Sequence, residues 1–259
     1  MRKFLLLVGI FGLFTPLMAQ KGFKFGLRFS PIVSWVNVRS DNDNSRVRDG
    51  NDFSARFGIS YGATLQYGFL DNVGLVSGLH IVNKGYTREV STISIDQPGI
   101  EPATITGATQ RVRMTTVEIP FLLRGRTGEV ANNLYIVGNF GVSLDVSAGY
   151  RNEWEGIRPD RYFQEDSTLF TGSGEINQAG EYLSPLNLTF VFGAGVDYEI
   201  EGVGMINAGL TYHQGLTDMR RQRGFEDFQD LDRDQRVPTM FGMEQVRMNY
   251  MALDLSFFF

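Results

Sequence analysis

Apolar and polar residues alternate along much of this chain with the period of a β-strand. From Phe57 to Phe69, in the segment FGISYGATLQYGF, every odd-numbered residue is apolar or aromatic, and every even-numbered one is small or polar. Such an alternation places the two sets of side chains on opposite faces of a strand. The pattern recurs along the chain and predicts eight strands, at residues 23–30, 57–69, 73–84, 112–125, 134–150, 187–200, 205–216 and 247–259.

The connections between these segments alternate in length. Short links at 70–72, 127–133 and 201–204 interleave with long polar connections at 39–53, 85–111, 151–186 and 217–246. Outer-membrane barrels with an even number of antiparallel strands have short periplasmic turns and long extracellular loops. The predicted fold is therefore all-β, an eight-stranded antiparallel transmembrane β-barrel with four long extracellular loops.

A soluble, secreted barrel of the lipocalin type would show the same alternation with inside and outside exchanged. Side-chain size favours the membrane barrel, because small polar residues fit the narrow lumen of eight strands and bulky apolar ones then face lipid. Aromatic residues near the strand ends are expected to form girdles at the two interfaces: Phe57, Tyr67, Phe69, Tyr150, Tyr198, Tyr212, Tyr250, Phe257 and Phe259.

The first nineteen residues have the order of a secretory signal peptide. Arg2 and Lys3 precede an apolar run from Phe4 to Phe14, and Ala19 marks the expected cleavage site. An uncleaved membrane helix is disfavoured, because spanning requires about 20 apolar residues. We predict a signal peptide at 1–19 and a barrel domain at 20–259.

The composition excludes several kinds of site and partner. The chain has no cysteine, which excludes disulfides, a lipidated amino-terminal cysteine and thiolate sites. The net charge is −5 without a basic block, so nucleic acid is not an expected partner.

Charged residues also occur on the face predicted to point inward. Charges in a narrow lumen need partners, so we expect a network of ion pairs that crosses and plugs the barrel. A continuous pore for small solutes is the alternative. The residues of the predicted network are Lys24, Arg28, Glu118, Arg124, Asp145, Asp197, Glu199 and Asp254.

The two histidines, His80 and His213, are predicted on the small-residue face. A lipid A-modifying hydrolase or acyltransferase would need a histidine beside a serine and an acid. Ser77 is near His80 in sequence but on the opposite face. We therefore expect lumenal hydrogen bonding and no catalytic residue, with the enzyme as a less favoured alternative.

Asp230, Asp232 and Asp234 have the spacing of a calcium loop. However, Gln235 stands where such a loop has glycine, and Phe241 stands where it ends in glutamate. The three aspartates are weak calcium candidates, and no cofactor is expected.

Arginine supplies most of the positive charge, and its planar guanidinium pairs well with phosphate. Lipopolysaccharide is therefore an expected partner. The arginines predicted to contact it are Arg88, Arg151, Arg220, Arg221 and Arg223.

Several segments taken in order resemble the PorT-like outer-membrane β-barrel family of Bacteroidota, over most of residues 22–259. They are FGLRFSP, GLHIVNKGYT, VEIPFLLRG, FGAGVDYEI, LTYHQGL and the aromatic carboxyl terminus. The resemblance implies insertion by the outer-membrane assembly machinery. That machinery would recognise the last strand through Tyr250, Leu253, Leu255, Phe257 and Phe259.

The family is named for a member needed for protein secretion. From these features we predict a non-enzymatic integral protein of the cell outer membrane that acts as an envelope structural or interaction component. An extracellular or secretion-system protein is its expected partner.

Overall fold

Nine β-strands account for the regular structure in the described part of the chain. The computed structural model describes residues 22–40, 51–70, 72–95, 103–157, 171–176, 184–219 and 244–259, so the predicted signal peptide lies outside it. No helix among these residues is long and apolar enough to cross a membrane. The strands are β1 (Phe23–Ser40), β2 (Asn51–Leu70), β3 (Val73–Ile95), β4 (Ala103–Ala131), β5 (Leu134–Ile157), β6 (Thr171–Ile176), β7 (Leu186–Ile200), β8 (Gly204–Gly215) and β9 (Glu244–Phe258).

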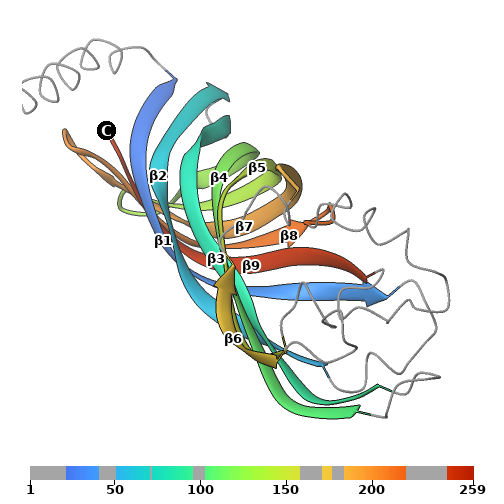
Figure 1. Ribbon diagram of the computed structural model, residues 1–259. Helices are drawn as coiled ribbons and strands as arrows, with labels where there is room; N and C mark the ends of the chain where they lie inside the picture. Colours follow the sequence, from blue (N-terminus) through green and yellow to red (C-terminus); the bar gives the residue numbers. More distant parts are fainter. Residues whose placement is uncertain are drawn as a thin grey trace, which may run out of the picture.

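Eight of these strands close into a barrel (Figure 1). Each pairs antiparallel with the next in the order β1, β2, β3, β4, β5, β7, β8 and β9, and β9 pairs back to β1. The short strand β6 lies outside this ring and pairs with the last residues of β5. The eight-stranded antiparallel barrel predicted from the alternation is confirmed.

The two ends of the barrel differ. At one end the strands are joined by tight turns, including residues 132–133 and 201–203, where Asn133 and Gly202 have positive φ angles of 58° and 70°. The carboxyl terminus lies at this end (Figure 1). We call it the short-turn end and the opposite one the long-loop end.

The predicted loop at 85–111 is wrong over most of its length. The β3–β4 ladder continues through Thr92↔Thr106 to Ile95↔Ala103. Within the predicted loop 151–186, β5 reaches Ile157 and β6 adds a further strand. The predicted link at 127–133 shortens to two residues because β4 extends to Ala131. Polar strands outside a membrane keep their ladder hydrogen bonds but lack the apolar alternation by which they could be detected.

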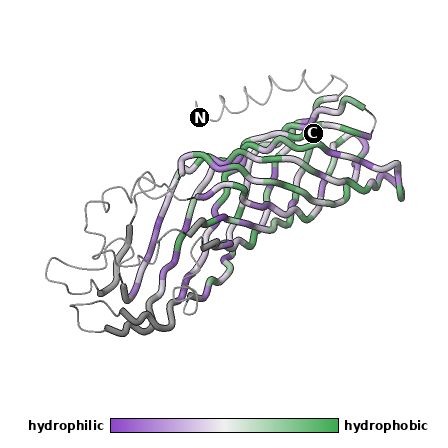
Figure 2. Tube along the Cα trace, turned by 90° about the vertical axis from the view of Figure 1, so that its right-hand side faces the viewer, coloured by the Kyte–Doolittle hydropathy of each residue, from purple (hydrophilic) through white to green (hydrophobic). Residues whose placement is uncertain are grey.

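The bulky apolar side chains point outward. Phe57 is 85% exposed, and the other strands of the barrel expose residues such as Phe29, Leu79, Phe121 and Phe140. A soluble barrel would bury these side chains, so the lipocalin alternative is wrong. Figure 2 shows apolar residues gathered toward the short-turn end and mainly polar ones toward the other.

The height of this apolar surface matches a bilayer. On β2 it runs from Phe57 to Phe69, which is roughly 40 Å along the strand. A strand tilt of about 45° converts this length into a height of about 28 Å, close to the hydrocarbon thickness of about 30 Å.

Two residues predicted for the aromatic girdles point inward instead. Tyr250 is 1% exposed, because it shares its face of β9 with Ala252 and Asp254 rather than with the lipid-facing Met251 and Leu253. Tyr150 packs against an apolar cluster inside the barrel. A bulge that places Thr115 opposite Gly149 and Thr116 opposite Ser147 reverses the parity of β5 before this tyrosine.

Candidate functional site: the barrel lumen

A buried ion pair crosses the lumen nearest the short-turn end. Arg124 Nη2 on β4 donates to Asp197 Oδ1 on β7 at 2.5 Å, and their side chains are 4% and 0% exposed. Asn207 Nδ2 donates to the same oxygen at 2.8 Å, and Arg124 Nη1 reaches Asn139 Oδ1 at 3.4 Å. Both charges are thus neutralised inside the barrel.

Nearer the rim of the short-turn end, the Glu199 carboxylate forms ion pairs with two basic side chains. Its Oε1 lies 2.7 Å from Arg126 Nη1 and 3.5 Å from Lys24 Nζ. These side chains line a cavity of about 660 Å³ at the short-turn end. Arg126 was absent from the predicted network because it directly precedes a segment read as a link.

A second buried pair lies near the middle of the lumen. Arg28 Nη2 donates to Asp254 Oδ1 at 2.5 Å, and Ser30 Oγ donates to the same oxygen at 2.7 Å. His80 lies beside them, with Nδ1 at 3.3 Å from Arg28 Nη1 and Nε2 at 3.0 Å from Thr64 Oγ1. Because arginine only donates, Nδ1 accepts, and the ring proton on Nε2 is directed to the threonine.

The centre of the lumen is formed by Glu118, Tyr250 and His213. The Tyr250 hydroxyl donates to Glu118 Oε2, and the tyrosine ring stacks on His213 with centroids 3.9 Å apart. His213 Nδ1 lies 3.5 Å from Glu118 Oε1. Among the described contacts no serine adjoins either histidine, and the hydroxyl beside His80 is that of Thr64. Ser77 lies on the opposite face of β3 from His80, as the sequence predicted.

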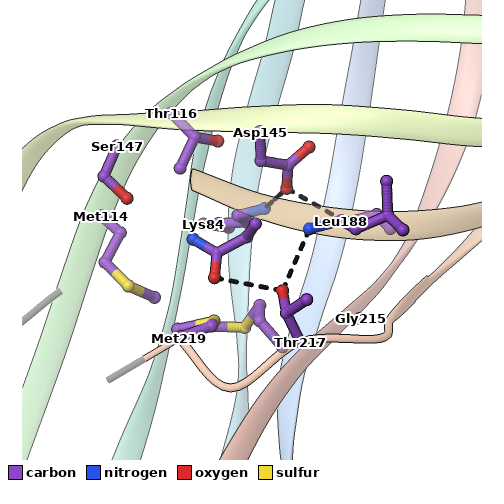
Figure 3. A pocket seen from close by; sticks show the side chains of 12 residues that line it. Lys84, Met114, Thr116, Asp145, Ser147, Leu188, Gly215, Thr217 and Met219 are labelled. Atoms are coloured by element: carbon purple, nitrogen blue, oxygen red, sulfur yellow. Dashed lines mark hydrogen bonds and ion pairs between the residues drawn. The ribbon is translucent and has the colours of Figure 1, made fainter. Parts of the chain in front are cut away.

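A third buried pair lies toward the long-loop end. Lys84 Nζ donates to Asp145 Oδ2 at 2.6 Å, and Thr189 Oγ1 donates to the same oxygen at 3.2 Å. Figure 3 shows this pair beside the methionines Met114 and Met219. The space between them is only about 10 Å³, roughly the volume that one water molecule needs.

Above Lys84 the lumen becomes apolar. One buried cluster there, the lumenal apolar cluster, has Phe53, Tyr86 and Tyr150 packed around it. The alternation gave no signal for it, because three of its residues lie outside the predicted strands and the other three are apolar residues on strand faces expected to be polar. Its members are Val36, Val112, Met114, Met219, Val246 and Met248.

All eight residues of the predicted network lie at inward positions of their strands, and the structure brings them together with three that were missed. Arg28 and Asp254 pair, as do Arg124 and Asp197, while Lys24 and Glu199 meet at the rim. Asp145 instead pairs with Lys84, and Glu118 binds Tyr250. The three missed residues are Lys84, Arg126 and Tyr250.

Other candidate residues lie elsewhere. Arg88, predicted to contact lipopolysaccharide, is 3% exposed and lies over the Phe53 ring, so that prediction is wrong. Asp230, Asp232 and Asp234 lie outside the described residues, as do Arg220, Arg221 and Arg223. Among the described residues, no group of three or more His, Asp or Glu could hold a metal ion.

A closed antiparallel barrel with a lipid-facing apolar belt and a polar, charge-paired interior defines an integral outer-membrane β-barrel. The chain belongs to the outer membrane protein beta-barrel domain family, whose sequence profile matches residues 17–221. The protein is therefore an outer-membrane protein.

Solved outer-membrane barrels show low similarity to the chain. Neisserial surface protein A is 8% identical with a TM-score of 0.41, and the match covers 92% of this chain and all of that one. OprG from Pseudomonas aeruginosa is 12% identical with a TM-score of 0.38, covering 92% and 96%. Ail of Yersinia pestis is 10% identical with a TM-score of 0.32, covering 91% and 99%. No curated protein matches the chain.

Proposed function

We propose that this protein is a non-enzymatic structural or interaction component of the envelope, with a lumen that does not conduct. Its long-loop end would face outside and meet an extracellular or secretion-system protein. The resemblance to the PorT-like family supports a role in protein secretion and an origin in Bacteroidota, and both belong to the proposal.

The closure of the lumen is the observation that carries this proposal. The Arg124–Asp197 pair, the Glu118–Tyr250–His213 centre and the lumenal apolar cluster follow one another along the barrel, and their side chains are buried. A hydrated ion would have to displace paired charges and then pass apolar side chains, both of which cost free energy.

Conductance across planar bilayers tests the closure. The full-length protein is expected to give no discrete current steps. Met219→Gly/Met248→Gly removes two side chains of the lumenal apolar cluster and tests whether a lumen cleared of them conducts. Regular steps from the unmodified protein would refute a closed lumen.

The projecting sheet supports the interaction role. At the long-loop end β3 and β4 pair beyond Arg88↔Gln110, and β5 with β6 continue the same sheet (Figure 1). Affinity capture from intact outer membranes with the unmodified chain, and with the ribbon shortened by deleting residues 91–107, tests this role. A partner retained by the unmodified chain and lost from the deletion variant is expected, and recovery of the barrel alone would contradict it.

A narrow pore is the second candidate, and the unpartnered polar atoms of the lumen favour it. Within the described residues Glu118 Oε1, Asp145 Oδ1 and Asp197 Oδ2 are buried without a hydrogen-bond partner. Such atoms are commonly hydrated. A chain of waters would bring small solutes only as far as the apolar cluster, so the bilayer experiment decides between the two candidates.

The absence of catalysis is likewise a proposal. It is supported by the engagement of His80 with Arg28 and Thr64 and by the burial of His213. Lipid A from envelopes with and without the protein is expected to have identical acylation by mass spectrometry. A change in acylation would show an enzyme.

Export and assembly complete the proposal. Cleavage after Ala19 is expected to give a mature chain that begins at Gln20, which amino-terminal sequencing would show. Leu253, Leu255 and Phe257 lie on the lipid side of β9 and Tyr250 on the lumen side. These three lipid-facing residues of the proposed assembly signal are thus accessible to the assembly machinery on the outer surface of the strand.

A further inference from the structure

Three methionines from separate segments of the chain meet around one small space inside the barrel. Met114 lies on β4, Met248 lies on β9, and Met219 follows β8 in the connection to β9. All three belong to the lumenal apolar cluster, and they are 3%, 3% and 7% exposed. All three also line the space of about 10 Å³ beside the Lys84–Asp145 pair (Figure 3). We call them the methionine triad.

The backbone of each methionine is fixed by main-chain hydrogen bonds. The Met219 N–H donates to the Val246 carbonyl on β9 at 3.0 Å, and the Met219 carbonyl accepts from the Ser184 N–H at 2.7 Å. Met114 and Met248 lie within paired strands of the barrel. Only rotation of the flexible side chains is therefore needed to direct the three sulfur atoms at a common ligand.

Two polar residues that line the same space have a buried oxygen without a hydrogen-bond partner within the described part of the chain. These oxygens are Thr116 Oγ1 and Asp145 Oδ1. The other carboxylate oxygen, Asp145 Oδ2, binds Lys84 Nζ and Thr189 Oγ1. A buried carboxylate oxygen without a partner costs free energy, and a cation beside it would lower that cost.

The buried charges at this level of the lumen sum to one negative charge. Lys84 balances Asp145, and Arg28 balances Asp254. Glu118 stands opposite Asp145 on the neighbouring strand, and neither buried basic side chain forms its ion pair with it. A single monovalent cation in the space would therefore be compensated by charges that the chain already holds.

We propose that the methionine triad binds a soft monovalent cation of the Cu(I) class through its thioether sulfur atoms. Thioethers are soft ligands that favour Cu(I), whereas hard cations such as Ca²⁺ require several oxygen ligands. The space has roughly the volume of one water molecule, so it would admit an ion only without its hydration shell. Thr217 lines the space as well and is exposed, which provides a route of entry from the long-loop end. This site is independent of whether the lumen conducts or a protein partner binds.

Metal binding by the full-length protein in detergent tests the proposal, with Cu(I) under reducing conditions and Ag(I) as a redox-stable analogue. One ion per chain is expected to bind, an excess of Ca²⁺ should not displace it, and X-ray absorption spectroscopy should show sulfur neighbours. Loss of an outer-shell partner typically weakens a metal site 10–100-fold, so Met219→Leu or Met248→Leu, which removes a direct ligand, should weaken binding at least about tenfold.

Met251→Leu is the matched control. Met251 lies on the same strand as Met248, but its side chain faces lipid and is 47% exposed. Leucine has nearly the volume of methionine, so each substitution removes the sulfur atom with little change in packing. The control is expected to bind the ion as tightly as the unmodified protein does. Equal losses in Met248→Leu and Met251→Leu, or an absorption spectrum with only oxygen and nitrogen neighbours, would overturn the proposal.

Thermal unfolding keeps the test independent of folding defects. Without metal, Met219→Leu/Met248→Leu is expected to unfold close to the temperature of the unmodified protein. Added Ag(I) should raise the unfolding temperature of the unmodified protein and of Met251→Leu but not that of the double variant, because an ion that binds only the folded state stabilises it. An equal rise in all three proteins would refute binding by the triad. If the unmodified protein binds neither ion, the proposal is wrong and the triad only packs the lumen.

Discussion

Removing Asp197 should destabilise the barrel far more than its size suggests. Its Oδ1 accepts hydrogen bonds from Arg124 at 2.5 Å and from Asn207 at 2.8 Å. Asp197→Ala would leave the Arg124 guanidinium, 4% exposed, without its counter-charge. Breaking a buried pair from one side typically costs about 3–5 kcal/mol, so we expect a loss of about 4 kcal/mol in the free energy of unfolding.

A double variant that removes both charges provides the decisive comparison. Replacing both partners, as in Arg124→Met/Asp197→Ala, removes the stranded charge, and such replacements are often close to neutral. The double variant should therefore be more stable than Asp197→Ala alone. A cost of the two substitutions equal to the sum of the single ones would mean that the residues do not interact.

Glu199→Ala provides the control on the same face of β7. Its carboxylate is about one-third exposed at the rim, where water and salt screen its pairs with Arg126 and Lys24, so the expected loss is at most about 1 kcal/mol. Urea unfolding from vesicles, followed by the fluorescence of the chain's two tryptophans, measures the unmodified protein and the four variants, with Arg124→Met alone as the fourth. An Asp197→Ala loss below about 1 kcal/mol would refute a dry, paired lumen at this level.

Three further substitutions test other levels of the barrel by the same unfolding assay. Tyr250→Phe keeps the aromatic ring but removes the hydroxyl bound to Glu118, and should cost about 1.5–3 kcal/mol; an unchanged stability would show that the carboxylate has another partner. Leu253→Arg places a charge on the lipid side of β9 and should cost about 2–4 kcal/mol, whereas no loss would contradict its lipid-facing position. Lys84→Met should cost about 3–5 kcal/mol by stranding Asp145, and Lys84→Met/Asp145→Asn should recover part of that loss; equal stability of the two variants would contradict the pairing.

The sequence predicted the barrel because alternation and side-chain size act together in the membrane. The segment from Phe57 to Phe69 keeps its parity without interruption, and its bulky residues point outward in the structure. The narrow lumen makes the inverse arrangement sterically unfavourable. The inward positions of Arg28, Glu118 and Asp197 follow from parity alone, since each alternates with the bulky lipid-facing residues of its strand.

Bulges limit how far side-chain direction can be predicted from the parity of positions in a strand. One extra residue near Gly149 turns Tyr150 into the lumen, and the irregularity between Ala55 and Ile59 leaves Arg56 beside the outward Gly85. A bulge changes the parity of everything beyond it and has no apolar signature of its own. The sequence also could not say which inward charge meets which, because pairs such as Lys84 and Asp145 depend on strands that are not neighbours in the barrel.

The β4–β5 ladder contains two like-charged pairs, one buried in the lumen and one on the outer surface, and burial gives them different weight in the stability of the barrel. Inside the barrel Glu118 stands opposite Asp145, and the chain supplies a Tyr250 hydroxyl to one and the Lys84 ammonium to the other. Both carboxylates are thus bonded from within. Outside, Arg113 stands opposite Arg151, and Glu153 Oε1 lies 3.6 Å from the first and 3.1 Å from the second.

The inner pair is stabilised by residues that fold with it, so its contribution is to the stability of the barrel. The side chains of the outer pair are about half exposed, so water and salt screen their repulsion. The same ladder therefore predicts that substituting a buried carboxylate or its partner costs several kcal/mol, while substituting either exposed arginine changes the stability by at most about 1 kcal/mol.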